Sequence, residues 1–257
     1  MHLIFIRHGD PDYKNNTVTE KGRKEVEYLA ERISKWNIKD FYCSPFGRAQ
    51  DTIKPAMEKM NRTYEVKPWL QEFNYKVIDP STRKERTGWD FMPDYYFSQK
   101  KFFDKDEWYN TEIYKSGSFK EHYEDLTKNF DELLSQYNYC RISKDKSLYK
   151  CTPHITEPYS NEEHLVPLQK DLDETNLVFV CHLGVMFAII SHLTGISPCQ
   201  MWQGFFVAPS SVTVLGAEER NPGEVFFRVQ MLGDVSHLTL HGEKASASGF
   251  FGNFTNF

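Results

Sequence analysis

The sequence predicts an α/β fold built on a parallel β-sheet. Over residues 1–66, short apolar segments alternate with longer amphipathic ones in the order strand, helix, strand, helix, strand. This alternation is typical of parallel strands joined by helical crossovers. A later apolar segment, 176–181, is followed by another helical pattern and extends the same plan.

The first elements can be assigned from their periodicity. Residues 2–6 (HLIFI) are apolar apart from His2, as in a strand buried on both faces. Residues 19–36 carry apolar side chains at helical spacing, and Thr19 is a candidate N-cap for that helix. The remaining early elements are a strand at 40–43, a helix within 44–60 and a strand at 63–66.

The middle of the chain departs from this pattern. Residues 73–165 are aromatic, charged and poorly periodic, apart from a helical pattern at 119–137 and a weaker one at 161–173. Because a connection of this length is uncommon, we expect a helical, aromatic-rich cap inserted into a single domain over residues 1–257.

The C-terminal part returns to regular patterns. After the strand at 176–181, a buried helix is expected at 184–195, with Gly195 ending it. Residues 210–217 and 225–233 are typical of a hairpin near the edge of the sheet. The tail at 239–257 is rich in Gly, Asn and Phe, and an irregular conformation is expected there.

Composition excludes several classes of function. The net charge of −5 provides no basic field for nucleic acid or an anionic membrane surface. No apolar run approaches the roughly 20 residues that span a bilayer. The five cysteines include no CxxC pair, which favours free thiols in a reducing compartment. A cytoplasmic protein is therefore expected.

Two predicted strands end in a histidine. His8 follows the first strand within IFIRHG, and His182 follows the strand at 176–181 within VFVCHLG. Ligands bind beyond the carboxyl ends of parallel strands, so His8 and His182 would face each other there if their strands are neighbours. A single histidine in such a place is more often structural.

Two arginines favour an anion site over the structural alternative. Arg7 precedes His8, and Arg48 lies in a segment that follows a strand and opens a helix, where backbone N–H groups favour anions. Guanidinium groups bind phosphate oxygens in bidentate fashion. Arg7, Arg48, His8 and His182 are therefore expected to surround one phosphoryl group.

The same residues suggest how a phosphoryl group would react. A neutral His8 can attack phosphorus, and nearby arginines disfavour its charged form. Glu72 is the candidate proton donor to the leaving oxygen. From chemistry alone, Glu72 has only a modest lead over the alternatives Asp10, Asp12 and Glu157.

These motifs resemble the histidine phosphatase superfamily, the phosphoglycerate-mutase-like group with an Arg-His-Gly motif. The resemblance rests on Arg7-His8-Gly9, on SPFGRAQDT at 44–52, on the Leu-x-Glu that ends at Glu72, and on CHLG at 181–184. VTEKGRKEVEYLAERI and LGDVSHL, at 232–238, are also similar to family segments. The likeness extends from about residue 3 to 238, with a gap over the cap.

The resemblance implies a three-layer α/β/α domain with a mostly parallel central sheet. It also implies a phosphohistidine at His8, proton donation by Glu72, and no metal or cofactor. The implied phosphate pocket consists of Arg7, Arg48 and His182, with Gly9 and Leu183 also lining the substrate site. Many members carry a Thr and an Asn after Arg-His-Gly where this chain has Pro11 and Lys14.

The function expected from these observations is hydrolysis of a phosphate monoester, either a small molecule or a phosphopeptide. A phosphoglycerate-type phosphomutase is the first alternative, because the basic run at 83–86 could hold a second phosphate. A non-catalytic binding module of the same fold is the second alternative. The aromatic cap forms either a wall over the pocket or a subdomain core, and a homodimer is possible through the tail.

Overall fold

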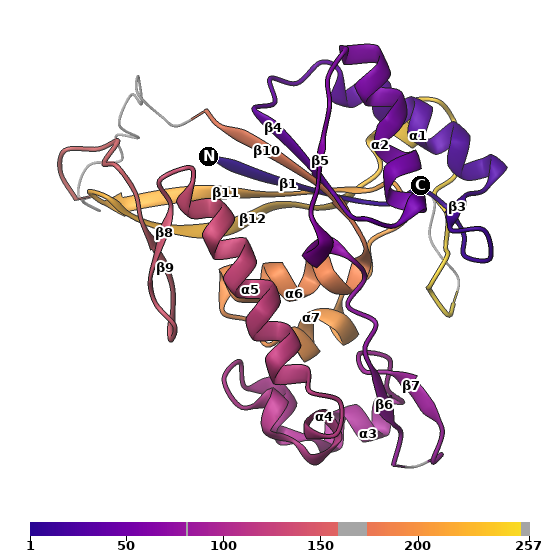
Figure 1. Ribbon diagram of the computed structural model, residues 1–257, viewed down its shortest axis with the longest axis vertical. Helices are drawn as coiled ribbons and strands as arrows, with labels where there is room; N and C mark the ends of the chain where they lie inside the picture. Colours follow the sequence, from indigo (N-terminus) through magenta and orange to yellow (C-terminus); the bar gives the residue numbers. More distant parts are fainter. Residues whose placement is uncertain (81, 159–173, 253–257) are drawn as a thin grey trace.

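The computed structural model describes residues 1–80, 82–158 and 174–252, and its centre is an eight-stranded sheet (Figure 1). In spatial order the strands are β5 (Glu65–Val66), β4 (Asp40–Cys43), β10 (Asn176–Cys181), β1 (His2–Arg7), β11 (Val212–Asn221), β12 (Glu224–Asp234), β9 (Lys146–Lys150) and β8 (Cys140–Ser143). Two short antiparallel pairs lie outside it: β2 (Pro11–Asp12) with β3 (Thr17–Val18), and β6 (Lys76–Ile78) with β7 (Glu85–Thr87).

The sheet has a parallel and an antiparallel half. Strands β5, β4, β10 and β1 are parallel, and the predicted β-α-β-α-β order of the N-terminal part is confirmed. From β1 outward, β11, β12, β9 and β8 pair antiparallel. The predicted hairpin is formed by β11 and β12, but it is not at the edge, because β9 and β8 lie beyond it.

Helices cover both faces of the sheet, as the α/β/α prediction requires (Figure 1). One face carries α1 and α2, and the other carries α5, α6 and α7. The α-helices are α1 (Glu20–Ile33), α2 (Gly47–Met60), α3 (Pro93–Ser98), α4 (Glu112–Lys115), α5 (Phe119–Ser135), α6 (Leu183–Thr194), α7 (Pro198–Gly204) and α8 (Ser236–Thr239). Short 3-10 helices cover Pro68–Leu70, Lys100–Phe103 and Trp108–Asn110.

Strand β1 contributes to two separate hydrophobic cores. Ile4 and Ile6 pack with α1 and α2, whereas Leu3 and Phe5 pack with the opposite layer. This division follows from the alternation of side chains across a strand. Both faces of β1 are buried, which explains why its sequence is continuously apolar.

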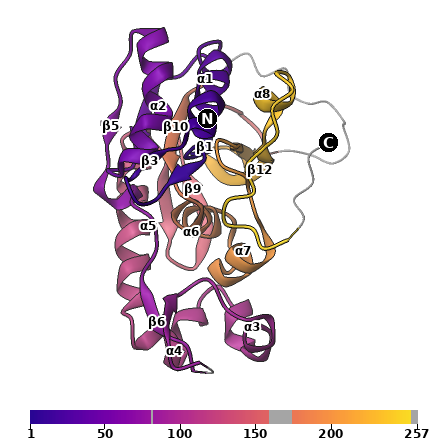
Figure 2. The same ribbon diagram turned by 90° about the vertical axis from the view of Figure 1, so that its right-hand side faces the viewer.

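The aromatic segment between β6 and α5 forms a lobe at one end of the molecule (Figure 2). Three of its aromatic side chains, Phe102, Trp108 and Tyr114, are fully buried and belong to the core that also contains α5 and α6. Phe102 and Phe119 pack on Tyr114, and Trp108 packs edge-on against it. For these residues the subdomain-core interpretation therefore holds.

The structure changes the expected limits of the cap. Within the expected cap at 73–165, strands β8 and β9 join the central sheet, so the described part of this segment also contributes to the main sheet. The helical pattern expected at 161–173 lies outside the described residues. The tail is irregular as far as it is described, from the end of α8 to residue 252. Within the described ranges, no helix is long and apolar enough to cross a bilayer.

Candidate active site

The two predicted histidines meet at the carboxyl end of the parallel strands. His8 directly follows β1 and His182 directly follows β10, and these strands are neighbours with Arg7 opposite Cys181. The amide of His8 donates to the carbonyl of Cys181 at 3.0 Å, so the register is kept beyond the last strand residue. The centroids of the two imidazole rings are 5.1 Å apart. The predicted pair is therefore in contact.

Arg7 and Arg48 lie beside this pair, and hydrogen bonds from Nη atoms of the guanidinium group hold each side chain in place. Arg7 is 3% exposed; its Nη1 donates to the carbonyl of Val207 at 2.7 Å and its Nη2 to that of Ser248 at 2.9 Å. Arg48, in the first turn of α2, donates from Nη1 to the Oδ1 atom of Asn16 at 3.0 Å. These anchors fix both groups close to the histidines.

One donor of each arginine, the Nε–H group, is buried without a hydrogen-bond partner in the described part of the chain. Among the described residues, neither the Nε atom of Arg7 nor that of Arg48 has a hydrogen bond, and the same holds for Nδ1 of His182. A buried polar group usually has a partner, and its burial without one costs about 1–3 kcal/mol. These three nitrogen atoms, from three distant segments, are candidate donors to a bound anion.

Ser44 contacts the ring of His182. Its hydroxyl oxygen accepts from the amide of Phe46 at 3.3 Å and lies 2.7 Å from Nε2 of His182. Burial, and then the positive charges around it, hold the pKa of His182 well below its usual value. When the Ser44 hydroxyl donates to Nε2, the neutral ring carries its proton on Nδ1, which is then a donor.

The backbone sets the tautomer of His8. Its Nδ1 lies 2.8 Å from the carbonyl oxygen of Gly9 and must donate to it. Burial, followed by the charge of Arg7, holds the pKa of His8 well below the usual histidine value. A neutral ring with its proton on Nδ1 leaves a lone pair on Nε2. The Nε2 atom of His8 is therefore able to act as a nucleophile.

Glu72 is the carboxyl group of the cluster. Its Oε1 atom accepts from the amide of Phe73 at 2.8 Å and from that of Val185, in the first turn of α6, at 3.1 Å. Burial raises the pKa of Glu72 above the ordinary glutamate value, against the opposing effect of these amides, Arg7 and Arg48. With Oε1 occupied by two donors, Oε2 is the atom that can carry a proton.

A close approach explains the glycine after the second histidine. A Cβ atom on Gly184 would lie only 2.7 Å from Oε1 of Glu72 and 2.8 Å from Nε1 of Trp89. Any larger residue would displace the carboxyl group. The CHLG motif therefore makes space for Glu72 in addition to supplying His182.

The two other predicted substrate-site residues are in place but are less available. The amide of Gly9 already donates to Oγ1 of Thr52 at 2.9 Å. Leu183 begins α6, and its side chain is 7% exposed and packs in the core. The alternatives to Glu72 lie differently: Asp10 accepts from Thr19 Oγ1 at 2.6 Å, and Glu157 is exposed.

Two residues shortly after Arg-His-Gly join the cluster although sequence analysis did not select them. The ring of Tyr13 meets that of His8 edge-on at 6.4 Å, and the guanidinium of Arg48 lies 5.4 Å from the same tyrosine ring. Asn16 binds Arg48 from a backbone with φ of 52°. The aromatic and amide residue types in 10–16 were the available signal.

The C-terminal tail also reaches the cluster. Besides the bond from Arg7 to the carbonyl of Ser248, the hydroxyl of Ser246 donates to Asp10. The ring of Phe250 packs on Phe206 at 5.0 Å, and the guanidinium of Arg7 lies 5.4 Å from that Phe206 ring. The tail thus contacts Arg7 and Asp10, which lie on either side of His8 in the sequence, and His8 is only 2% exposed.

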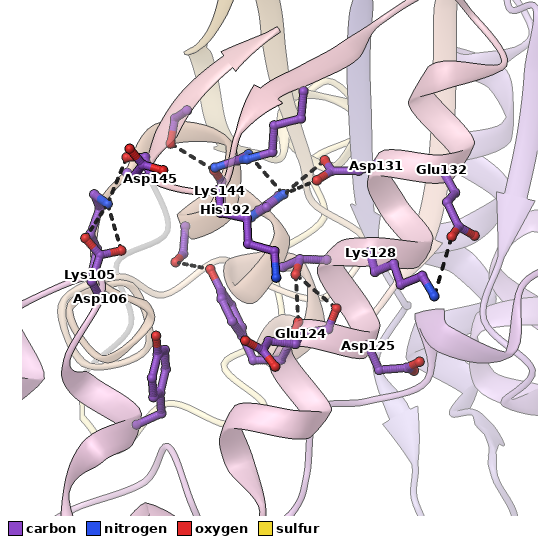
Figure 3. Close-up of a pocket in the computed structure, with 17 residues that line it drawn as sticks. Lys105, Asp106, Glu124, Asp125, Lys128, Asp131, Glu132, Lys144, Asp145 and His192 are labelled. Carbon is purple, nitrogen blue, oxygen red and sulfur yellow. Dashed lines mark hydrogen bonds and ion pairs between the residues drawn. The ribbon is translucent and has the colours of Figure 1, made fainter.

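A cavity of about 630 Å³ lies at the other end of α6 (Figure 3). Charged side chains from α5 and the β8–β9 hairpin line it, including Asp131, which pairs with His192 at 2.9 Å, and Arg141. None of the cluster around His8 lines this cavity. Its lining therefore belongs to a different region of the molecule.

Comparison with known proteins identifies the family. The sequence model of the histidine phosphatase superfamily (branch 1) matches residues 3–139, more than half of the 257 residues. The chain belongs to the histidine phosphatase superfamily. The match includes His8, Arg48 and Glu72, whereas His182 lies beyond it and joins the site through the pairing of β10 with β1.

Solved structures of several phosphatases share this fold. A mycobacterial glucosyl-3-phosphoglycerate phosphatase is 16% identical with a TM-score of 0.55, over 90% of this chain and 98% of that one. A phosphoserine phosphatase from Entamoeba histolytica is 16% identical with a TM-score of 0.56, over 92% and 98%. An alpha-ribazole phosphatase from Shigella flexneri is 17% identical with a TM-score of 0.52, over 91% and 97%. At such identities the likeness is one of fold.

A curated relative of the superfamily matches a shorter segment. The 2,3-bisphosphoglycerate-dependent phosphoglycerate mutase of Thermoplasma acidophilum is 36% identical over 69 residues. This is 23% of the present chain and 34% of the mutase, so the chain matches about a third of the length of that relative. Members of the superfamily are thus phosphatases or mutases, and this chain is expected to be an enzyme.

Proposed function

We propose that this protein is a phosphatase that hydrolyses a phosphate monoester through a phosphohistidine on His8. The observation that carries the proposal is the set of three buried nitrogen atoms without partners, contributed by Arg7, Arg48 and His182. N–H groups fixed in a site from which water is excluded stabilise the charge that develops on the oxygens of a transferring phosphoryl group. The proposal assigns that charge stabilisation to side chains and needs no metal.

The first step would form the phosphoenzyme. The Nε2 lone pair of His8 attacks phosphorus while the bond to the leaving oxygen breaks. The proton on Oε2 of Glu72 passes to that oxygen, and the alcohol departs. The Nδ1–H bond to the Gly9 carbonyl supports the positive charge that the imidazole acquires.

The second step would release phosphate. The Glu72 carboxylate, now deprotonated, accepts a proton from a water molecule whose oxygen attacks phosphorus. The bond from phosphorus to Nε2 breaks, and its electron pair returns to His8. Glu72 then holds a proton again, and inorganic phosphate leaves. His8 and Glu72 have returned to the protonation states of the starting enzyme.

The alternative of a phosphomutase is supported by the relative from Thermoplasma acidophilum. A mutase must hold a second phosphate or carboxylate, which requires extra positive charge at the mouth of the pocket. The basic run expected to provide it is partly committed: Arg86 forms an ion pair with Asp79 at 2.8 Å and donates to the carbonyl of Asp90. We therefore favour hydrolysis over transfer.

Trapping the intermediate tests the proposal. Rapid acid-free quenching with a ³²P-labelled aryl phosphate is expected to label His8 in the wild type and not in a His8→Ala variant. A panel of monoesters, sugar phosphates and phosphopeptides would then identify the substrate class. Transfer of phosphate to 2-phosphoglycerate instead of water would favour the mutase, and absence of any label or turnover would favour a binding module.

The cellular compartment and the binding partners are also proposals. All five cysteines lie in the described part of the chain, and none is in a disulfide, which suits a reducing cytoplasm. The net charge of −5 supports a small phosphate ester or phosphopeptide as partner and not a nucleic acid. A homodimer through the tail remains a prediction.

A further inference from the structure

A group of metal-ligating side chains lies at the end of the β11–β12 hairpin. Cys151 and His154 lie on the loop that follows β9, three residues apart, and Glu219 lies on β11. One potential ligand atom from each residue lies within 4.8 Å of the other two, and Nδ1 of His154 is 3.1 Å from Oε2 of Glu219. Sulfur, nitrogen and oxygen donors therefore converge on one point.

Backbone hydrogen bonds hold this group in place. Oε1 of Glu219 accepts from the amide of Gly223 at 2.6 Å, and its Oε2 accepts from the amide of His154 at 3.1 Å. The amide of Cys151 donates to the carbonyl of Gly223 at 3.0 Å. A carboxylate that is itself hydrogen-bonded is oriented before an ion arrives, as in metal sites generally.

The turn at Gly223 is shaped to receive the loop. Gly223 has φ of +73°, and a Cβ atom there would lie 3.1 Å from the carbonyl oxygen of Cys151 and 3.3 Å from Cγ of Pro153. The hairpin turn and the Cys-x-x-His loop thus pack directly on each other. The side chain of Glu219 is only 7% exposed in this packing.

An ion could reach the group from solvent. A polar cavity of about 340 Å³ is lined by both Cys151 and His154, together with Tyr137, Tyr139 and Thr175. The two side chains therefore face an open space and are not enclosed by the core. Convergent ligands, a hydrogen-bonded carboxylate and a path of access are the features expected of a metal site.

We propose that Cys151, His154 and Glu219 bind one Zn²⁺ ion. A thiolate and an imidazole favour zinc over Ca²⁺ and Mg²⁺, which prefer oxygen ligands alone. Three protein ligands and one water complete a tetrahedron. On binding, the thiol proton passes to solvent, and zinc replaces the hydrogen between Nδ1 and Oε2 as the imidazole proton moves to Nε2.

The site is remote from the phosphate cluster. Glu219 lies seven residues along β11 from Val212, which corresponds to roughly 23 Å at about 3.3 Å per residue. Ser211, just before Val212, accepts from the amide of Arg7 and marks the end of the strand near the phosphate cluster. Zinc is therefore expected to join the loop to the hairpin without changing the chemistry at His8.

Cobalt and zinc titrations test this site. Purified full-length protein, stripped of metal, is titrated with Co²⁺, and Zn²⁺ affinity is measured by competition with a chromophoric chelator. One Co²⁺ per chain is expected, with a near-ultraviolet thiolate-to-cobalt band. Cys151→Ser is expected to lose the band and to weaken Zn²⁺ binding by at least about 100-fold. The matched control is Cys140→Ser, which removes an exposed thiol from the neighbouring strand β8 and is expected to bind as the wild type does.

A second variant separates binding from folding. Glu219→Gln keeps an oxygen that can accept from the Gly223 amide but removes the ligand charge, so it is expected to fold and to bind Zn²⁺ at least about 10-fold more weakly. The proposal is overturned if the wild type shows no thiolate band, or if Cys151→Ser and Cys140→Ser behave alike. In either case the group is a histidine–glutamate ion pair only. Phosphatase turnover is expected to be equal with and without zinc, so the two proposals fail independently.

Discussion

Asn16 lies two residues beyond Lys14, the position at which many superfamily members carry an asparagine. Its Oδ1 atom accepts from Nη1 of Arg48, and its backbone has φ of 52°, which asparagine tolerates better than most residues. The altered spacing is thus absorbed by one left-handed residue. Lys14, at the usual position, donates its amide to Asp12 instead.

Replacing Asn16 is expected to weaken phosphate binding. Asn16→Gly keeps the left-handed backbone and removes only the amide that holds Arg48, so kcat/KM is expected to fall roughly 10-fold, or about 1.4 kcal/mol. Steady-state kinetics with one aryl phosphate measures this. Asn15→Ala is the control, since Asn15 is exposed and bonds Asp12. Equal losses in both variants would contradict the role given to Asn16.

The pH dependence of turnover is expected to report His8 and Glu72. Activity requires neutral His8 and is lost as pH falls through its lowered pKa, well below the ordinary value of about 6.5. It also requires protonated Glu72 and is lost as pH rises through its raised pKa, above the ordinary glutamate value of about 4.3. Glu72→Gln should reduce kcat and abolish the alkaline limb. An alkaline limb that survives this substitution would assign it to another group.

For individual residues, the sequence predicted the location of those that lie directly at a strand end or a helix start. His8, His182, Arg7 and Arg48 belong to that kind, because parallel strands bring their carboxyl ends together. Tyr13 is different, since its place depends on how an irregular loop folds back over the sheet.

Among the elements, the C-terminal tail is the one that most changes the expected picture. Residues 243–252 were expected to be irregular, and they are, yet Ala245 and Ser246 are buried and Ser248 bonds Arg7. A tail that contacts Arg7 through a backbone carbonyl leaves little trace in side-chain patterns. Hydrophobic periodicity therefore has no means of detecting it.

Shortening the tail is expected to expose His8. Ending the chain at Glu243 removes the Ser248 contact, and modification of His8 by diethyl pyrocarbonate should accelerate at least about 10-fold. Mass spectrometry of the peptide containing His8 measures the rate. Phe251→Ala is the control, since Phe251 is 91% exposed and the rest of the tail stays in place. An unchanged rate in the shortened protein would show that the tail does not limit access.

The C-terminal GDVSHL motif, in contrast, has a structural place close to the site. The amide of Ser210 donates to the carbonyl of His8 at 3.0 Å, and the Ser210 hydroxyl lies 3.2 Å from Nε2 of His237. Burial lowers the pKa of His237 to about 4, so it supports the turn as a neutral group.

The strands and helices with clear periodicity were predicted well. Strands β8 and β9 were not, because Cys140–Lys150 has mixed polarity and lies at the edge of the sheet.

For the whole molecule, one buried carboxyl group links stability to pH. Glu25 on α1 is fully buried, accepts from the amide of Asp10 at 2.9 Å, and has its pKa raised to about 7 by burial. A raised carboxyl pKa means that the folded protein binds the proton more tightly than the unfolded chain. This contribution is complete below the ordinary value of about 4.3 and is lost as pH rises through about 7.

Glu25→Gln is expected to flatten that dependence. The wild type should lose stability on the order of 3 kcal/mol from this group between pH 5 and pH 8.5, whereas the variant keeps a neutral acceptor throughout. Urea unfolding at several pH values measures the difference between the two proteins. Glu27→Gln is the control on an exposed position of the same helix. Parallel curves for wild type and Glu25→Gln would contradict the prediction.

The position of His8, the proposed nucleophile, directly after β1 has a consequence for partial denaturation. Strand β1 lies between β10 and β11 and contributes side chains to both hydrophobic cores, so its amides should be among the last to exchange with deuterium. Glu72 and the tail, in contrast, are carried by loops. In mild urea the protein should therefore lose turnover while it still binds inorganic phosphate. The reason is that the phosphate-binding residues at the strand ends should stay folded at urea concentrations that already unfold the loop of Glu72.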